Sequence, residues 1–287
     1  MTLEGYLSGH LRPSTAERYM RDIRQYLGET PGAGHATYAD IIRYLEKLRK
    51  RYPNKGTASR MLHSIKKYYE YLHRTGQVPS NPATNIHLKN LPSKEVRFTG
   101  LFSTKELESL LAVRWPRKSM SLRNKLIVSL LVYQAPMRQE LAMLRTCDVD
   151  FENATIKIPG TAVTNARELP LHPLQVMVLY RYIHEERGRP GNDHGLLLTD
   201  RHGQPISGDA IRRLLRHCKG QFPGKSPTAT AIRQSAIANK LKEGMGLRQV
   251  QVFAGHKYPS ATERYKQPET ERLKAEVDKC HPLDRGA

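Results

Sequence analysis

Cysteine is scarce in this sequence, and its distribution excludes two kinds of site. The chain has three cysteines, Cys147, Cys218 and Cys280, an odd number of residues that lie far apart. This pattern fits neither a disulfide framework nor the closely spaced ligands of a metal site. Such cysteine usage is typical of a reducing compartment, so we predict a cytoplasmic protein.

Long apolar segments are also absent. The longest apolar run lies around Leu126–Val132, well short of the roughly 20 residues that a membrane-spanning helix needs. The first residues, Met1–Tyr6, lack the basic start and the apolar middle of a secretory signal peptide. The sequence contains no internal repeat and no low-complexity tract. These absences predict a globular chain with no membrane partner.

Acidic residues are few relative to basic ones. The 287 residues include 47 Lys or Arg against 27 Asp or Glu, a net charge of +20. Residues 1–90 carry 15 of these basic residues against 7 acidic ones, so the excess is not a charged tail. Spread over a chain long enough for two domains, this charge indicates a polyanionic partner, most often nucleic acid. Two basic domains suggest a clamp around double-stranded DNA; a merely soluble basic protein is the alternative.

Residues 1–90 are predicted to form a helical domain. Apolar residues recur at helical spacing in three segments, about 14–27, Tyr38–Arg51 and about Thr57–Arg74. Segments rich in proline and glycine separate these helices, and a linker is expected at 91–100.

Several basic residues lie outside the apolar stripes of these helices. We expect five of them to contact DNA phosphates: Arg18, Arg21, Arg60, Lys66 and Lys67. Phosphate contacts position a protein without reading bases, so they predict no target sequence. A solvated helix face is the alternative for each residue.

The rest of the chain is predicted to be mostly helical with one small antiparallel sheet. Thr155–Ile158 and Ala166–Leu171 are expected to pair as a hairpin, and Leu196–Thr199 to form a further short strand. Helices are expected to start near Phe102 and Pro136 and to span Leu122–Tyr133, Leu174–Glu186, Ile211–Cys218, Thr228–Lys242 and Leu247–Phe253.

Four residues in a fixed order suggest chemistry on a phosphodiester. Arg138 and Arg233 come first, and Gly255-His256 is followed nine residues after the histidine by Tyr265. Arginine is always charged and donates a planar fork of hydrogen bonds to phosphate. A tyrosine can attack phosphorus if cations or a base help its hydroxyl, with a pKa of about 10, to lose its proton.

Each of these residues alone has a simpler explanation. An isolated arginine is usually part of a surface ion pair, and a histidine after glycine is usually structural. Most of the 14 tyrosines are expected in cores or interfaces. Tyr258 competes with Tyr265 as the nucleophile, but it lies only two residues after His256. Order and spacing together favour the catalytic interpretation.

The sequence resembles the tyrosine recombinase or phage integrase family, which includes the Xer, Cre and lambda integrase types. Arg138 stands just before a Glu-Leu pair, and Arg167–Leu171 is similar to the exit of the family's β-hairpin. Arg233 stands 23 residues before His256, and Tyr265 follows at the family's spacing. The resemblance covers nearly the whole chain.

The resemblance implies a mainly α fold in two parts. Residues 1–90 would be an N-terminal helical core-binding domain of the SAM-like type. Residues 101–287 would be an α-rich catalytic domain with a small antiparallel β-sheet, the DNA breaking–rejoining enzyme fold. It also implies a homo-oligomer, a tetramer on DNA, with contacts from a C-terminal tail helix at about 268–287. A simple local helix is the alternative for this tail.

The resemblance also implies a reaction. Arg138 and Arg233 would clamp the scissile phosphate, and His256 would donate to a phosphate oxygen or position the nucleophile. Tyr265 would displace a 5′-hydroxyl and form a 3′-phosphotyrosyl bond. Because this bond conserves the energy of the broken one, rejoining needs no ATP, and neither a metal nor another cofactor is expected.

The sequence departs from the family pattern at three places. Arg138 and Glu140 are one residue closer than usual. Ala162 stands where the family has a hairpin lysine, the residue that protonates the leaving 5′-oxygen. Thr230 replaces the first histidine of the family's His-x-x-Arg motif.

Two lysines are candidates for the missing proton donor. Lys157, on the preceding predicted strand, is the first, and Lys225 is the second. Thr230 can hydrogen-bond to phosphate and is counted among the DNA-binding residues, but it cannot act as a cationic acid.

Three functions fit these observations. The first is a site-specific DNA recombinase or integrase. The second is a DNA-binding protein on the same scaffold with impaired catalysis, acting in regulation or DNA architecture. The third is a type IB-like topoisomerase, which would relax supercoiled DNA regardless of sequence.

Overall fold

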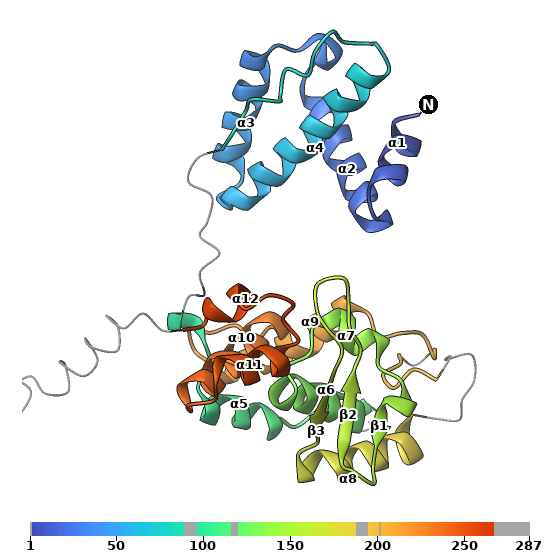
Figure 1. Cartoon of the computed structure of the whole chain (residues 1–287), viewed down its shortest axis with the longest axis vertical. Helices are drawn as coiled ribbons and strands as arrows, with labels where there is room; N and C mark the ends of the chain where they lie inside the picture. The colour runs from blue at the N-terminus through green and yellow to red at the C-terminus, as the bar shows by residue number, and fades with distance from the viewer. Residues whose placement is uncertain are drawn as a thin grey trace, which may run out of the picture. The chain divides into compact units, whose positions relative to one another are not determined.

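The computed structural model describes residues 2–88, 96, 98–115, 120–187, 195–200 and 202–266. The chain divides into two compact units, Met1–Lys94 and Glu95–Ala287, both drawn in Figure 1. Among the described helices, none combines the length and the apolarity needed to cross a membrane. Most of the expected linker and all of the expected tail lie outside the described residues.

The first unit consists of α-helices. They are α1 (Leu3–His10), α2 (Pro13–Glu29), α3 (Tyr38–Arg51) and α4 (Lys55–Arg74), with a short 3₁₀ turn, η1 (Ala33–His35). The three predicted helices correspond to α2, α3 and α4. Helix α1 was not predicted, because only Tyr6 and Leu7 of its eight residues are buried, too few to show a helical period.

Local sequence explains where α3 begins. The Thr37 hydroxyl accepts from the Asp40 amide, and the Asp40 carboxylate accepts from the Thr37 amide, which is a reciprocal helix cap. Two tyrosines in the core of this unit, Tyr26 and Tyr69, have hydrogen-bonded hydroxyls. The Tyr26 and Tyr69 hydroxyls lie 2.7 Å apart, and Tyr69 donates to the Ala33 carbonyl at 2.5 Å.

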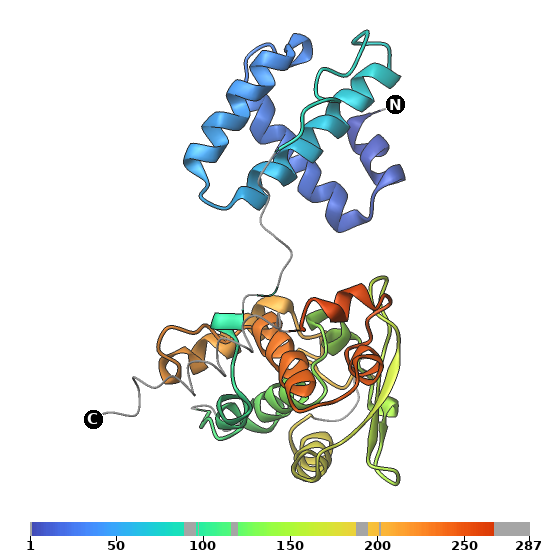
Figure 2. The same ribbon diagram turned by 60° about the vertical axis from the view of Figure 1, so that its left-hand side comes forward.

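The second unit is mostly helical and carries a three-stranded antiparallel sheet at one edge (Figure 2). The strands β1 (Val149–Asp150), β2 (Thr155–Ile158) and β3 (Arg167–Pro170) lie side by side in that order. The helices and helical turns of this unit are η2 (Phe98–Gly100), α5 (Thr104–Leu111), α6 (Ser121–Tyr133), α7 (Arg138–Met143), η4 (Thr146–Asp148), α8 (Pro173–Arg181), η5 (Tyr182–Glu186), α9 (Gly208–His217), η6 (Cys218–Gln221), α10 (Ala229–Lys242), α11 (Leu247–Ala254) and α12 (Ser260–Glu263).

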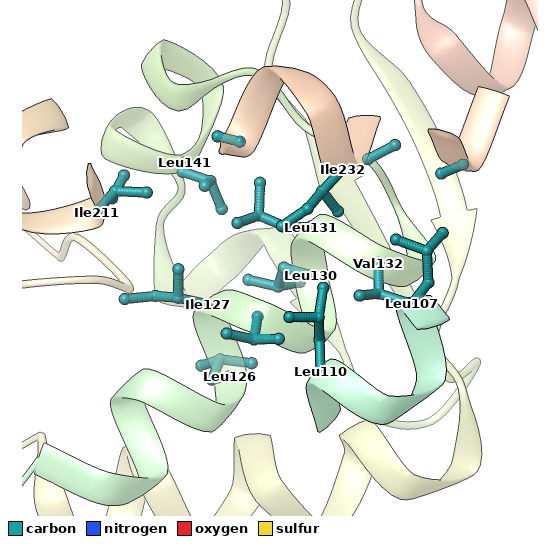
Figure 3. Packing of buried hydrophobic residues seen from close by; sticks show 14 of the residues in the cluster. Leu107, Leu110, Leu126, Ile127, Leu130, Leu131, Val132, Leu141, Ile211 and Ile232 are labelled. Atoms are coloured by element: carbon teal, nitrogen blue, oxygen red, sulfur yellow. The ribbon is translucent and has the colours of Figure 1, made fainter. Parts of the chain in front are cut away.

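Helix α6 is the centre of the second unit. Its residues 126–132 are all buried, as expected for a helix covered on every side. Helices α5, α8 and α10 pack against it. Figure 3 shows Leu131 of α6 near Leu141 of α7 and Ile232 of α10, and Ile211 of α9 belongs to the same buried cluster. This core fixes α7 and α10, the helices that carry Arg138 and Arg233.

The predicted mainly α fold with a small antiparallel sheet is confirmed. Two details differ. Leu196–Thr199 is not a strand, because its ends form only isolated bridges, to Arg145 and to Pro205. The helix predicted over Leu174–Glu186 changes from α to π geometry at Tyr182.

Candidate active site

A buried ion pair joins α7 to the β2–β3 hairpin. Nη1 and Nη2 of Arg167 lie 2.9 and 3.0 Å from Oε1 and Oε2 of Glu140. Glu140 also accepts from the Met137 amide at 2.7 Å and from the Thr164 hydroxyl at 2.6 Å. Burial acts to raise the pKa of Glu140, but these hydrogen bonds and the charge of Arg167 hold it below its usual range. Glu140 is therefore ionised inside the second unit, where it accepts hydrogen bonds from the start of α7 and from the hairpin.

Arg233 is held against two backbone carbonyls. It lies on α10 and is 6% exposed. Its Nη1 donates to the Ala135 carbonyl, and its Nη2 donates to the Ala254 carbonyl at 2.5 Å. Burial, and then the charge of Arg167, lowers the pKa of Arg233 to about 10, so it stays charged at neutral pH. A guanidinium fixed in this way can meet a phosphate without reorganising.

The loop that carries His256 begins at Gly255, which ends α11. Gly255 has φ +66°, a left-handed conformation that favours glycine. A Cβ atom here would lie 2.7 Å from Nη1 of Arg167 and 2.9 Å from the Asn165 carbonyl oxygen. Glycine is therefore needed both for the turn and for the close approach of the hairpin.

A buried threonine holds His256. Nδ1 of His256 lies 2.8 Å from Oγ1 of Thr262, which is 0% exposed. Burial, followed by the charges of Arg233, Arg264 and Arg167, lowers the pKa of His256 to about 4. The imidazole is therefore neutral at physiological pH.

We expect His256 to make folding less favourable in acid. Its pKa is about 4 in the folded protein and 6.5 when unperturbed, so between these values the unfolded chain binds the additional proton. The free energy of unfolding therefore falls as the pH falls through this range. Urea unfolding at about pH 8 and about pH 5 measures the effect, and His256→Gln should lose less stability between the two than the wild type. Equal losses in both proteins would contradict the expectation.

Tyr265 follows α12 and lies beside His256. The two ring centroids are 6.1 Å apart and the ring planes differ by 18°. Burial raises the pKa of Tyr265, against the opposing effects of Arg233, Arg264 and a hydrogen bond with Gln234. The phenol is therefore protonated at neutral pH and must lose its proton when it attacks.

Arg138 lines a small pocket. It is exposed at the start of α7 and lines a pocket of about 230 Å³. Arg212 of α9 lines the same pocket, as do Thr228 and Thr230 at the start of α10. The structure thus brings Arg138 and Thr230, two of the predicted site residues, to one place.

The direction of Arg138 follows from the burial of Glu140. Residues two apart on an α-helix point about 200° apart, so Arg138 is turned outward when Glu140 is turned into the core. Because Arg138 and Glu140 are only two residues apart, the burial of Glu140 turns Arg138 outward.

The tip of the β2–β3 hairpin carries no cation. Ala162 and Val163 are exposed there. Lys157 also has an exposed side chain, on β2, between inward-facing residues of that strand. Lys225 is engaged elsewhere, in an ion pair with Glu106 at 2.7 Å. Neither lysine makes a hydrogen bond to Tyr265 within the described part of the chain, and their role as proton donors stays a prediction.

The basic residues predicted to contact DNA differ in whether they have ion-pair or hydrogen-bond partners within the first unit. Arg18 and Arg21 are exposed on α2 and have no ion-pair partner among the described residues. The other three have partners within the first unit: Arg60 with Asp22 at 3.4 Å, Lys66 with the Thr84 carbonyl at 2.8 Å, and Lys67 with Glu70 at 3.0 Å. DNA binding by all five stays a prediction, and α2 presents the free cations.

Three residues near the site, Arg167, Thr164 and Thr262, were not predicted to have a role in it. A signal existed for Arg167, because the period-2 pattern of β3 places it on the same face as the buried Leu169. No local pattern marks the two threonines. Within the described residues, no group of three His, Cys, Asp or Glu side chains is placed to hold a metal.

A mostly helical fold in which Arg233 shifts the pKa of both His256 and Tyr265 agrees with the expected class, the tyrosine recombinases. The chain belongs to the phage integrase family. The model "Phage integrase family" matches residues 101–272, and the model "Phage integrase, N-terminal SAM-like domain" matches residues 4–76. The resemblance inferred from the motifs is confirmed.

Curated relatives match this chain over nearly their whole length. Tyrosine recombinase XerC of Syntrophus aciditrophicus (strain SB) is 25% identical over 305 residues, which cover 100% of this chain and 96% of that protein. Tyrosine recombinase XerD of Halalkalibacterium halodurans is 26% identical over 282 residues, which cover 95% and 93%.

Solved structures share the fold. The Tn1549 transposon integrase in complex with a circular intermediate DNA has a TM-score of 0.71 at 18% identity and covers 96% of this chain and 99% of its own. A lambda integrase dimer bound to a COC′ core site has a TM-score of 0.70 at 16% identity, covering 92% of each chain. At these identities the likeness shows the fold alone.

Proposed function

We propose that this protein is a site-specific DNA recombinase that cuts and rejoins double-stranded DNA through Tyr265. The observation that carries the proposal is the placement of the Tyr265 ring 6.1 Å from the His256 ring, within the field of the buried Arg233. Relatives named as tyrosine recombinases support it, as does the net charge of +20.

In the proposed first step, the Tyr265 oxygen attacks a phosphorus atom of one DNA strand. A bond forms between this oxygen and phosphorus while the bond from phosphorus to the 5′-oxygen breaks. Tyr265 loses its proton, and the leaving oxygen gains one to become a 5′-hydroxyl. Attack by a 5′-hydroxyl on the phosphotyrosine reverses the step and rejoins a strand, so no nucleotide is consumed.

The neighbouring side chains stabilise the charge that develops. Arg233 neutralises the non-bridging phosphate oxygens. When the Thr262 hydroxyl donates to Nδ1 of His256, the ring carries its proton on Nε2 and can donate it to a phosphate oxygen. Arg138 is proposed to clamp the scissile phosphate together with Arg233, and Thr230, which lines the same pocket as Arg138, is proposed to hydrogen-bond to the DNA backbone.

Lysine at position 162 is expected to accelerate cleavage. The leaving oxygen needs a proton, and Ala162 stands exposed at the hairpin tip. We expect Ala162→Lys to raise the rate of covalent complex formation about 10-fold or more, because a positioned general acid contributes a large factor. Val163→Lys is the matched control, since it adds the same charge at the neighbouring exposed position. Equal gains from both variants would mean that added charge alone is responsible.

We also propose a homo-oligomer, a tetramer on DNA, in which the C-terminal tail of each copy contacts a neighbour. An apolar pocket of about 470 Å³ supports such a contact. Its lining comes from α6, β3, α10, the loop after α10, and α11: Tyr133, Leu169, Pro170, Lys240, Met245, Arg248, Gln249, Val252 and Phe253.

In the proposed function, residues 1–90 form the core-binding domain and residues 101–287 form the catalytic domain. We propose that the protein acts in the cytoplasm.

Covalent trapping tests the proposed function. The protein is incubated with duplex DNA that flanks its own gene, and the reaction is stopped with detergent. We expect a DNA-linked protein band on a denaturing gel. Tight binding without this band would instead indicate a DNA-binding protein that does not cleave. Relaxation of any supercoiled plasmid, whatever its sequence, would indicate a type IB-like topoisomerase.

A further inference from the structure

The turn of the β2–β3 hairpin is bonded directly to the loop of His256. Thr164 and His256 form an isolated antiparallel bridge, and the Asn165 amide donates to the Gly255 carbonyl at 2.9 Å. Thr164 is 2% exposed. The backbone of the hairpin is therefore bonded to the start of the segment that leads from Gly255 to Tyr265.

The Thr164 hydroxyl bonds this turn to Glu140 of α7. It lies 2.6 Å from Oε1 of Glu140 and 2.8 Å from the Thr161 hydroxyl. The ionised Glu140 can only accept, so Thr164 donates to it and accepts from Thr161. Thr161 Oγ1 in turn accepts from the Thr164 amide at 3.1 Å. The turn is thus tied to α7 through one hydroxyl.

Two further features restrict the hairpin to this arrangement. Arg167, three residues after Thr164, pairs with both carboxylate oxygens of Glu140. Gly160 begins the turn, and a Cβ atom there would lie 2.8 Å from the Ala166 amide nitrogen. Glu140 therefore accepts hydrogen bonds from the turn, through Thr164, and from strand β3, through Arg167.

We propose that Thr164 is a positioning residue for the reaction at Tyr265, an inference that rests on the proposed function. Its hydroxyl fixes the turn on Glu140, and the backbone of Thr164 and Asn165 then fixes the Gly255-His256 loop. Because Thr164 is 2% exposed, its side chain is expected to act through the loop and not directly on DNA or the reacting atoms. Its loss should change the rate of the chemical step and leave DNA affinity unchanged.

Three threonine variants of the full chain test this role. Thr164→Val removes the hydroxyl at constant shape, and Thr164→Ser keeps it. Thr155→Val is the matched control, because Thr155 also lies on the hairpin and bonds a glutamate, Glu168, at 2.8 Å, but on the exposed face. At saturating DNA we expect Thr164→Val to form the covalent complex about 10- to 100-fold more slowly, since small misplacements of reacting groups are costly. Thr164→Ser and Thr155→Val should stay close to the wild type.

A second measurement separates this inference from the proposed function. Amide hydrogen exchange followed by NMR should show faster exchange at Asn165 in Thr164→Val and unchanged exchange in the interior of α10. If the wild type forms no covalent complex, the proposed function fails, and the exchange at Asn165 alone decides whether Thr164 positions the loop. Unchanged exchange at Asn165, or an equal loss of rate in Thr155→Val, overturns the proposal.

Discussion

Replacing Tyr265 by phenylalanine is expected to abolish the covalent protein–DNA complex. The substitution removes only the oxygen proposed to attack phosphorus and keeps the ring that lies 6.1 Å from His256. A phenyl ring offers no nucleophile, so we expect a loss of about 10³-fold or more in covalent product. The amount of DNA-linked protein after detergent measures the loss. DNA affinity, measured in parallel, should stay unchanged because the hydroxyl is one atom of a large interface.

Tyr258→Phe is the matched control for the nucleophile. Tyr258 lies two residues after His256 and is 71% exposed, whereas Tyr265 packs against the core of the second unit. Tyr258→Phe should form the covalent complex at the rate of the wild type. A complex that persists in Tyr265→Phe and disappears in Tyr258→Phe would reverse the assignment.

Replacing Glu140 by alanine is expected to be the most destabilising change of a single charged residue in the second unit. Arg167 would keep its charge while its side chain is 2% exposed. Its Nε is already buried without a hydrogen-bond partner among the described residues. Removing one partner of a buried ion pair typically costs about 3–5 kcal/mol. Urea unfolding followed by circular dichroism measures the free energy of unfolding.

Two comparisons show whether the ion pair is the cause. Glu185 also pairs with an arginine, Arg181, at 3.0 Å, but both side chains are 53% exposed. Glu185→Ala should therefore leave the free energy of unfolding almost unchanged. The double variant Glu140→Leu/Arg167→Met removes both charges and should recover much of the lost stability. If the double variant is as unstable as Glu140→Ala, an unpaired charge is not the reason for the loss.

The sequence by itself determined the class of fold and the family, because both depend on patterns that are local or ordered along the chain. Apolar spacing predicted α2, α3 and α4, and two short segments close together in the sequence predicted the β2–β3 hairpin. The order of Arg233, His256 and Tyr265 pointed to the family that the comparisons show. Helix α1 and the π turn at Tyr182 escaped prediction, because each is short and has no periodic signal of its own.

Only the tertiary structure decided which charged and polar groups meet. Glu140 and Arg167 are 27 residues apart, and Arg233 and the Ala135 carbonyl are 98 apart, distances over which no local pattern specifies a contact. Arg138 shows the same point, because its outward direction depends on which face of α7 the core covers. A charged side chain is buried or exposed according to what distant segments pack around it, and those segments together set its solvation.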